Sequence, residues 1–371
     1  MTSAIVQFGT SRFLQAHADL MLSQARDAGQ EVGAVTVIET TGSPASRARV
    51  AAFAKGHPFP VRIRGLEHGK TRDTTYDVRG IEAGLSARTD VPALREAFIN
   101  ARYVLSNTGD KGYAVPEDPD PTLNGWSGFP ELLTALLRER FEASGTPLTL
   151  LPCELISRNG DTLRGIVLDL ARRGAGNAAF VRWVQDRCIF VNALVDRIVS
   201  EPIDPVGAVA EPYALWALEA RPGFVPPCTH DQMVVVPDLG PIERKKLFIL
   251  NLSHTLLAQR WLDRGAPERL TVREAMTDAK TRAWLDSIVT QDILPAFPAD
   301  DGAFAYWAQC RERFDNPFLD HRIADIANNH TAKIERRARG FLSWAGSSDA
   351  GSATCPRLRA AFGDALSEGE A

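Results

Sequence analysis

The chain has 371 residues, enough for two domains that each bury a core, and its 44% hydrophobic and 24% charged content is that of a globular protein. Its formal net charge of −4, with no basic block, argues against nucleic acid or a membrane surface as the main partner. No apolar run approaches the roughly 20 residues of a membrane span, and the first residues, MTSAIVQFGTSRF, lack the pattern of a signal peptide.

The five cysteines are scattered and contain no CxxC pair, which predicts reduced thiols in the cytoplasm and provides no zinc site. The seven histidines show no HExxH arrangement. His321 and His330 are expected on a polar helix, in solvated or capping roles. We therefore predict no metal.

In the first half of the chain, short apolar runs alternate with amphipathic runs, the pattern of a parallel sheet with crossover helices. Strands are predicted at 4–8, 35–39, 103–106 and 148–153, and two more, at 60–66 and 75–82, are predicted to pair as an inserted hairpin. Helices are predicted from just after Gly9 to about residue 28, at 91–101, at 129–143 and from about residue 161.

After about residue 240 the strand-like runs end. The segments 243–264, 270–293, 302–313 and 319–344 are all predicted helices, and the Pro-rich stretch before them is a predicted linker between domains. The predicted fold class is α/β, with an N-terminal Rossmann-type doubly wound domain at 1–238 and an all-α C-terminal domain at 239–371.

A strand, a glycine and a helix, followed by a second strand that ends in an acid, form the arrangement of a dinucleotide-binding unit. Gly9 would form the tight turn, the helix that begins at Ser11 would face the pyrophosphate, and Glu39 would bind the ribose hydroxyls. Glu39 would also repel a 2′-phosphate, which favours NAD over NADP. However, GTSRFL holds only one of the three glycines of GxGxxG. The alternative is a βαβ unit without a nucleotide, with Glu39 a solvated carboxylate.

Two polar stretches follow later strands and would reach the carboxyl edge of the sheet, where doubly wound folds bind ligands. In SNTGDKGY, Asn107, Thr108 and Gly109 are candidate cofactor contacts, and a plain turn is the alternative. In PCELISRNGD, Asn159 is a candidate amide donor, and the alternative is a turn and helix cap.

The stretch ERKKLFILNLSH, residues 243–254, places polar side chains among apolar ones. At about 100° per residue, Glu243, Lys246 and His254 lie near one another on one face of a helix, and Asn251 lies about 60° beyond His254. A partly desolvated lysine can act as a general acid or base, and an asparagine amide can stabilise an oxygen that gains negative charge. The alternative is a structural helix with one snorkelling lysine and two capped polar side chains.

Motifs along nearly the whole chain resemble those of the polyol-specific long-chain dehydrogenases, the mannitol dehydrogenase family. FGTSRFLQAH resembles the family's FGxGxFxRAH, VLSNTGDKGY its SxTxxEKGY, CELISRNGD its CExxxxNG, and LVDRIVSEP its MVDRITP. RFDNPFLDHRIADIANNHTAKIERR resembles NPxxxHxxxxIxxNxxxK, and Lys246-x4-Asn251-x2-His254 resembles the catalytic signature. The matches stand in family order from residue 5 to about residue 337.

The resemblance implies a zinc-independent, NAD(P)-dependent oxidation of a secondary alcohol, with a Rossmann-type domain and a helical C-terminal domain. It implies Lys246 as the general acid/base and Asn251, with Asn159, as stabilisers of the developing alkoxide. The resemblance also implies that His254 positions the substrate.

Further positions are implied by the same resemblance. Glu243 matches a residue that relays the proton in some members, and Asp196 and Lys333 match substrate contacts. The implied cofactor contacts are Phe8, Gly9, Thr10, Ser11, Arg12, Phe13, Glu39, Asn107, Thr108 and Asn159.

Within the family, ELISRNG, AEPYALWALE and DIANNHTAK resemble the hexuronate branch, the tagaturonate and fructuronate reductases. Ser11 departs from the second motif glycine, Asp325 stands where the mannitol branch has arginine, and NLSH stands where the hexuronate branch has NGxH. We expect a tagaturonate reductase-like enzyme that uses NAD on a linear sugar acid or polyol. Lys333 is the first candidate to hold the substrate anion, and Arg197 is the second.

Two alternatives stay open: a mannitol or mannitol-1-phosphate type polyol dehydrogenase, and a non-catalytic NAD-binding sensor. The expected partner is this small-molecule substrate, with neither nucleic acid nor membrane, and the expected assembly is a monomer or a small homo-oligomer.

Overall fold

The computed structural model describes residues 4–109, 111–173, 177–347 and 354–366. The chain forms two compact units. The first consists of Met1–Ile63 and Asp73–Leu239, and the second of Arg64–Arg72 and Gly240–Ala371. The sequence placed the boundary between domains after residue 238. Each unit buries hydrophobic clusters of its own.

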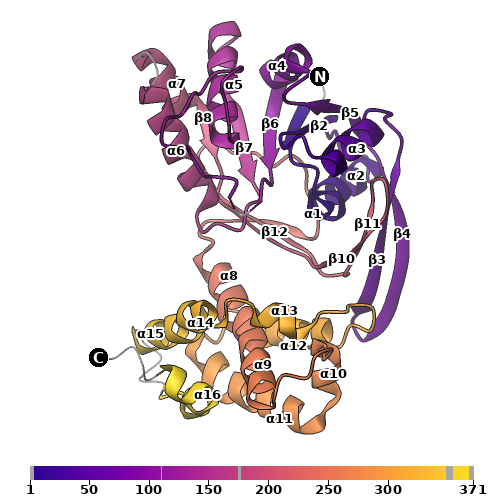
Figure 1. Cartoon of the computed structure of the whole chain (residues 1–371), viewed down its shortest axis with the longest axis vertical. Helices are drawn as coiled ribbons and strands as arrows, with labels where there is room; N and C mark the ends of the chain where they lie inside the picture. Colours follow the sequence, from indigo (N-terminus) through magenta and orange to yellow (C-terminus); the bar gives the residue numbers. More distant parts are fainter. Residues whose placement is uncertain (1–3, 110, 174–176, 348–353, 367–371) are drawn as a thin grey trace. The chain divides into compact units, whose positions relative to one another are not determined.

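The first unit is built on a parallel sheet of six strands in the spatial order β5-β2-β1-β6-β7-β8 (Figure 1). Numbered by their appearance within this sheet, the strands follow the order 3-2-1-4-5-6 of the Rossmann fold, and the order reverses between β1 and β6. The predicted fold class is thereby confirmed. The strands are β1 (Ala4–Phe8), β2 (Val35–Glu39), β5 (Ile81–Ser86), β6 (Ala101–Ser106), β7 (Leu148–Pro152) and β8 (Cys188–Phe190).

Successive residues of a strand point to opposite faces of the sheet. Val6 and Phe8 therefore join one hydrophobic cluster, with Leu136 of α5, whereas Ile5 joins another, with Met21 of α2. Both faces are covered, so the strands are nearly continuous apolar runs. The helical segments of this unit are α1 (Arg12–Leu14), η1 (Gln15–Asp19), α2 (Leu20–Asp27), α3 (Pro44–Phe53), α4 (Val91–Asn100), α5 (Phe129–Ala143), α6 (Asn159–Arg173) and α7 (Ala178–Arg187).

Two smaller sheets have the strand orders β10-β11-β3-β4 and β13-β12-β9. The predicted pairing of two strands is present, because β3 and β4 are neighbours in the first of these sheets. The predicted bounds 75–82 are wrong, because Gly80, with φ +92°, separates β4 from β5 of the parallel sheet. The strands between 193 and 236 are too short to show clear periodicity, and they were not predicted. The strands of the two sheets are β3 (Phe59–Glu67), β4 (Lys70–Val78), β9 (Ala193–Asp196), β10 (Val199–Pro202), β11 (Ala208–Ala210), β12 (Leu215–Glu219) and β13 (Met233–Val236).

From Gly240 on, the described residues of the second unit form helices, as predicted (Figure 1). Its other segment, Arg64–Arg72, belongs to strands β3 and β4 and the turn between them. Phe248, Leu256, Met276, Trp307 and Phe341 belong to its buried core. Its segments are α8 (Gly240–Lys245), η2 (Lys246–Asn251), α9 (Leu252–Asp263), α10 (Val272–Thr277), α11 (Ala279–Ile288), η3 (Val289–Ile293), η4 (Leu294–Ala296), α12 (Ala303–Phe314), α13 (Ile323–Ala327), α14 (His330–Lys333), η5 (Ile334–Arg339), α15 (Gly340–Ser347), α16 (Pro356–Phe362) and η6 (Gly363–Leu366).

Two long predicted helices are interrupted. In 270–293, Asp278 leaves the helical conformation and caps α11 by accepting hydrogen bonds from the N–H groups of Lys280 and Thr281. In 319–344, Asn329 adopts φ +56° between α13 and α14. Aspartate and asparagine favour such positions because their short side chains bond the nearby backbone and tolerate the left-handed region.

All five cysteines are buried free thiols, as predicted. In the part of the chain that the structure describes, no helix is long and apolar enough to cross a membrane. The same residues contain no group of three or more His, Cys, Asp or Glu side chains arranged to hold a metal ion.

Candidate active site

The turn that follows β1 lies where the strand order of the parallel sheet reverses. Gly9 has φ +115°, which side chains rarely allow, and a Cβ added there would meet the carbonyl oxygen of Asn107 at 2.6 Å. Both the backbone conformation and the close approach of the β6 loop therefore require glycine. The tight turn predicted at Gly9 is present.

Ser11 and Asn107 join the loops that follow β1, β6 and β7. The hydroxyl of Ser11 accepts a hydrogen bond from the N–H of Leu14 (3.2 Å) and donates one to Oδ1 of Asn107 (3.0 Å). The amide of Asn107 donates in turn to the carbonyl oxygen of Cys153 (2.8 Å). The serine that replaces the second motif glycine thus has structural partners on both sides.

Glu154, which was not predicted as a functional residue, anchors the loop after β6. Its buried carboxylate accepts hydrogen bonds from the hydroxyls of Ser106 (3.0 Å) and Tyr113 (3.2 Å). It also accepts from the N–H (3.1 Å) and hydroxyl (3.0 Å) of Thr108. A carboxylate is buried at reasonable cost only when such donors surround it. Burial, with the charge of Glu154, raises the pKa of Tyr113, which keeps the phenol a donor.

Glu39 ends β2, as predicted, but it is only 2% exposed. One carboxylate oxygen accepts from the N–H of Gly42 (2.7 Å) and the other from the hydroxyl of Ser86 (2.5 Å) on β5. The alternative of a solvated strand-end carboxylate is therefore wrong. These contacts make Glu39 a link between two strands, and its binding of ribose stays a prediction.

Asn159 is fully buried, and its amide is committed to the backbone. Nδ2 donates to the carbonyl oxygens of Pro152 (3.1 Å), Glu154 (3.0 Å) and Ala193 (3.0 Å). Oδ1 accepts from the N–H groups of Gly160 (2.9 Å) and Ala193 (2.9 Å). Both amide hydrogens are used within the first unit, so the side chain joins the β7 loop to β9.

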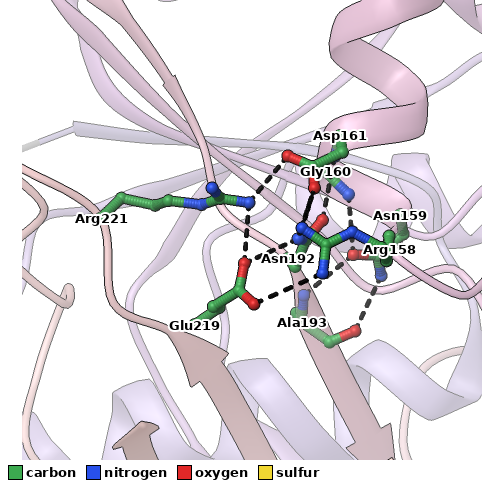
Figure 2. A network of polar contacts seen from close by, with 8 residues as sticks. All are labelled: Arg158, Asn159, Gly160, Asp161, Asn192, Ala193, Glu219 and Arg221. Carbon is green, nitrogen blue, oxygen red and sulfur yellow. Dashed lines mark hydrogen bonds and ion pairs between the residues drawn. The ribbon is translucent and has the colours of Figure 1, made fainter. Parts of the chain in front are cut away.

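A network of charged side chains surrounds this asparagine (Figure 2). Arg221 bonds to Asp161 (2.7 Å) and Glu219 (2.7 Å), and the amide of Asn192 donates to the same two carboxylates. Arg158 pairs with Asp161 as well. Burial works against ionisation of Asp161, but Asn192 and the two arginines hold its pKa below the ordinary value. The network therefore holds the start of α6 in place.

Three other predicted cofactor residues face the protein. Phe8 is fully buried in the core, and the ring of Phe13 stacks on His17, with 4.7 Å between the centroids. Arg12 donates to the carbonyl oxygens of Ile203 and Gly207 and pairs with Asp204. Because the side chain of Phe8 is fully buried, Phe8 can contact a ligand only through its backbone.

Asp196 and Arg197 lie at the end of β9 and directly after it, and both are buried. The guanidinium of Arg197 donates to the carbonyl oxygens of Ala16 and Pro212 and to Oε1 of Gln232. These partners commit Arg197 to the fold, which contradicts the expectation that it holds a substrate anion.

In the second unit, Lys246 and Asn251 are the first and last residues of a π-helical segment. The N–H of Leu252 bonds to the carbonyl of Leu247, five residues earlier. A π-helix holds more residues per turn than an α-helix, so the count of about 100° per residue does not apply between Lys246 and His254. Glu243 precedes the segment, in α8. Single π-helical turns inside α-helices are frequent at functional sites.

The wider π turn requires partners for its carbonyl groups. The hydroxyl of Thr255 donates to the carbonyl oxygen of Asn251 (3.0 Å), and Arg337 donates to the same oxygen (3.1 Å) and to the hydroxyl of Thr255 (3.0 Å). Arg337 lies in another π-helical segment, η5, and burial lowers its pKa to about 10. One arginine therefore connects two irregular helical turns.

His254 is buried beside several cationic side chains. Burial lowers its pKa well below the ordinary 6.5, and the charges of His321, Arg313, Arg337 and Lys333 lower it further. Its ring lies 5.0 Å from that of His321, centroid to centroid. The imidazole of His254 is therefore neutral near pH 7. We call Arg313, Lys333 and Arg337 the cationic set.

Lys333 closes α14 and donates from Nζ to the carbonyl oxygen of Ile326 (2.7 Å). Its pKa is lowered by burial and then by the charge of Arg337. Among the described residues, no carboxylate lies within ion-pair distance of Lys333 or Arg337. His321 was expected in a solvated or capping role, but it is partly buried, its ring packs against that of His254, and burial lowers its pKa.

The chain matches two family models. The model of the mannitol dehydrogenase Rossmann domain matches residues 3–224, and that of the mannitol dehydrogenase C-terminal domain matches residues 238–342. The chain belongs to the mannitol dehydrogenase family. The predicted family is thus confirmed, and the protein is an enzyme of the oxidoreductase class.

Curated relatives in this family include the altronate oxidoreductases of Yersinia pestis and Bacillus subtilis (strain 168). They are 30% and 28% identical to this chain over 362 and 359 residues, which is 90% of this chain and 73% of each relative. The structure of D-sorbitol dehydrogenase in substrate-free form is 22% identical, with 89% of this chain and 73% of that chain covered and a TM-score of 0.75. The Pseudomonas fluorescens mannitol 2-dehydrogenase complex with NAD and D-mannitol is 19% identical, with 93% and 78% covered and a TM-score of 0.70. Both structures share the fold.

The sequence missed Glu154, Arg337 and His321 as residues of these sites. An acid directly after an apolar strand, in LLPCEL, is a signal for Glu154. Arg337 stands among neighbouring arginines in IERRAR, and nothing in the sequence distinguishes it.

Proposed function

We propose that this member of the mannitol dehydrogenase family is an NAD-dependent oxidoreductase that interconverts a secondary alcohol and a ketone on a linear sugar acid, as an altronate oxidoreductase does. Relatives about 30% identical carry that name. The observation that carries the choice of a sugar acid over a neutral polyol is the cationic set beside the neutral His254. Because Lys333 and Arg337 have no carboxylate partner among the described residues, a substrate carboxylate can supply the missing negative charge.

The first unit suits a dinucleotide cofactor. Its strand order is that of NAD-binding folds, and the Gly9 turn lies at the switch point. Glu39 keeps acceptor capacity for ribose hydroxyls, since each carboxylate oxygen has two lone-pair sites and each has one donor. When bound, NAD accepts the hydride, and NADH returns it.

The helical unit contributes the acid/base chemistry. In ketone reduction, Lys246 donates a proton to the oxygen that gains negative charge, and the amide of Asn251 donates a hydrogen bond to the same oxygen. The neutral imidazole of His254 orients a substrate hydroxyl, and Glu243 returns a proton to Lys246. Asn159 acts as a positioning residue of the first unit, because its amide hydrogens are committed.

The same proposal assigns roles to two further residues and a compartment to the enzyme. Lys333 contacts the substrate carboxylate, and Asp196, at the end of β9, is a second substrate contact. The buried free thiols suit a reducing compartment, which supports a cytoplasmic enzyme.

The test is an assay of NADH oxidation with tagaturonate, fructuronate, fructose and fructose 6-phosphate. We expect turnover of a ketouronate with a higher kcat/KM than any neutral ketose. In Lys333→Met, KM for the ketouronate should rise about 10-fold or more, because a charge-assisted hydrogen bond is lost, while weak turnover of fructose should not change. Preference for the neutral ketose identifies a polyol dehydrogenase instead, and NADH binding without any turnover identifies a sensor.

A further inference from the structure

Arg49 of α3 reaches the turn that follows β1. Its Nε donates to the hydroxyl of Thr10 (3.0 Å), and its Nη2 donates to the hydroxyl of Ser46 (3.2 Å). Thr10 is 6% exposed, and Arg49 is half-buried. The hydroxyls of Thr10 and Ser46 thus hold the guanidinium of Arg49 at the turn after β1.

The charge of Arg49 is not neutralised by the chain. Arg12, at the same turn, pairs with Asp204 at 2.6 Å, whereas no carboxylate of the described residues lies within ion-pair distance of Arg49. Burial lowers the pKa of Arg12, and the charge of Arg49 lowers it further. The two guanidinium groups are therefore close enough to repel each other. A guanidinium carries five N–H donors, and hydroxyls occupy two of those on Arg49.

The turn also lacks a usual means of binding phosphate. The second glycine of the fingerprint lets the backbone approach a pyrophosphate closely, and here that position is Ser11. The hydroxyl of Ser11 is already engaged with Leu14 and Asn107. A cofactor phosphate at this turn therefore needs positive charge from another residue, and arginine is well suited to it because its donors form a planar fork.

We propose that Arg49 is a phosphate-binding residue of the dinucleotide site, which uses its remaining N–H groups to bind a phosphate of the cofactor. This inference rests on the proposed function. The phosphate is either the pyrophosphate, which NADH and NADPH share, or the 2′-phosphate, which NADPH alone carries.

The test is the binding of NADH and NADPH to the wild-type chain and to Arg49→Gln, measured by titration at two salt concentrations. We expect about a 10- to 100-fold rise in Kd, the range that follows from losing hydrogen bonds to a charged group, and a weaker dependence of Kd on salt. A parallel loss for both cofactors assigns the pyrophosphate, and a loss for NADPH alone assigns the 2′-phosphate. The matched control is Arg47→Gln, the same change at an exposed position of the same helix, which should leave both Kd values within about twofold.

If wild-type protein binds a dinucleotide and Arg49→Gln binds both forms as Arg47→Gln does, the inference is wrong while the proposed function stands. If the wild-type chain binds neither dinucleotide, the proposed function fails and the inference fails with it. Should Arg49→Gln not fold, Arg49→Lys serves in its place: lysine keeps the charge but cannot span both hydroxyls, so the Kd for the affected cofactor should rise about 3- to 10-fold. An unchanged Kd in the lysine variant also contradicts the inference.

Discussion

Arg337 donates a hydrogen bond to the backbone carbonyl oxygen of Asn251 at 3.1 Å, between residues 86 positions apart in the sequence. Asn251 ends the π-helical segment that begins at Lys246, and an α-helical register would give the residues of this segment different directions. The arginine thus stabilises the backbone conformation that orients two proposed catalytic side chains.

Replacing this arginine should therefore lower kcat. In Arg337→Lys the positive charge stays, but a lysine cannot bond both the Asn251 carbonyl and the Thr255 hydroxyl as the guanidinium does. We expect kcat to fall about 10-fold or more, because small displacements of catalytic groups are costly, with little change in the Kd for NADH. Steady-state kinetics and NADH titration provide the measurement. Arg336→Lys, at an exposed neighbouring position, is the control, and equal effects of the two changes would contradict the prediction.

Lys246→Ala should lose on the order of 10²–10⁴ in kcat, the usual effect of removing a positioned acid/base, with NADH affinity unchanged. Lys245 is not a neutral control, because its Nζ pairs with Asp301 at 2.9 Å. Lys246→Arg is a better comparison, since arginine keeps the charge but does not exchange its proton near neutral pH. Both variants should be similarly slow. High activity in Lys246→Arg would show that the lysine provides charge and not a proton.

Glu154→Gln should loosen the loop that carries Asn107 and Thr108. The carboxylate accepts four hydrogen bonds, and the amide nitrogen of glutamine cannot accept any of them. We expect a loss of about 1–3 kcal/mol in the free energy of unfolding, measured by urea titration, and a weaker affinity for NADH. Glu117→Gln, at an exposed position, should change neither quantity.

Gly9→Ala should impair both stability and cofactor binding. The added Cβ would lie 2.6 Å from the Asn107 carbonyl oxygen, and φ is +115°. Gly29→Ala provides the comparison, because its φ of +84° brings backbone strain but no atom lies within 4 Å of the new Cβ. Thermal melting should show a larger loss for Gly9→Ala, about 1–3 kcal/mol of strain with the clash in addition. Similar melting temperatures and similar NADH affinities for the two variants would show that the turn has room for a side chain.

Asp19 should make stability depend on pH. It is buried in η1, where Gln7 donates to it at 3.3 Å, and burial raises its pKa from 3.8 to about 7. The folded state holds the proton more tightly than the unfolded state. The contribution of Asp19 to the free energy of unfolding is therefore fully present below about pH 4 and is lost as the pH rises to about 7.

The variant Asp19→Asn removes this titration. Its stability relative to wild type should be greater at about pH 8 than at about pH 5, as measured by urea unfolding. Asp27→Asn, at an exposed position of the same helical run, is the matched control. A difference between Asp19→Asn and wild type that is the same at both pH values would mean that Asp19 ionises normally in the folded chain.

The sequence alone determined the elements whose patterns are local. A short, nearly continuous apolar run predicts β1, a glycine predicts the turn after it, and helical periodicity predicts the helices after residue 240. Motifs in family order predicted the family and the fold class, because such motifs are continuous in sequence. Breaks at Asp278 and Asn329 were missed, since their side chains cap or turn the backbone without disturbing the apolar period.

Only the tertiary structure decided what the polar side chains contact. The sequence around Asn159 does not show whether its amide donates to a substrate or to the protein. In the structure the amide donates to the backbone carbonyl oxygens of Pro152, Glu154 and Ala193. Arg49 and Thr10 are 39 residues apart, and no local period relates them. The π-helical register from Lys246 to Asn251 likewise depends on partners in other helices. Which distant segments meet depends on how the hydrophobic cores pack, and for that reason a local sequence pattern cannot predict the hydrogen bonds between them.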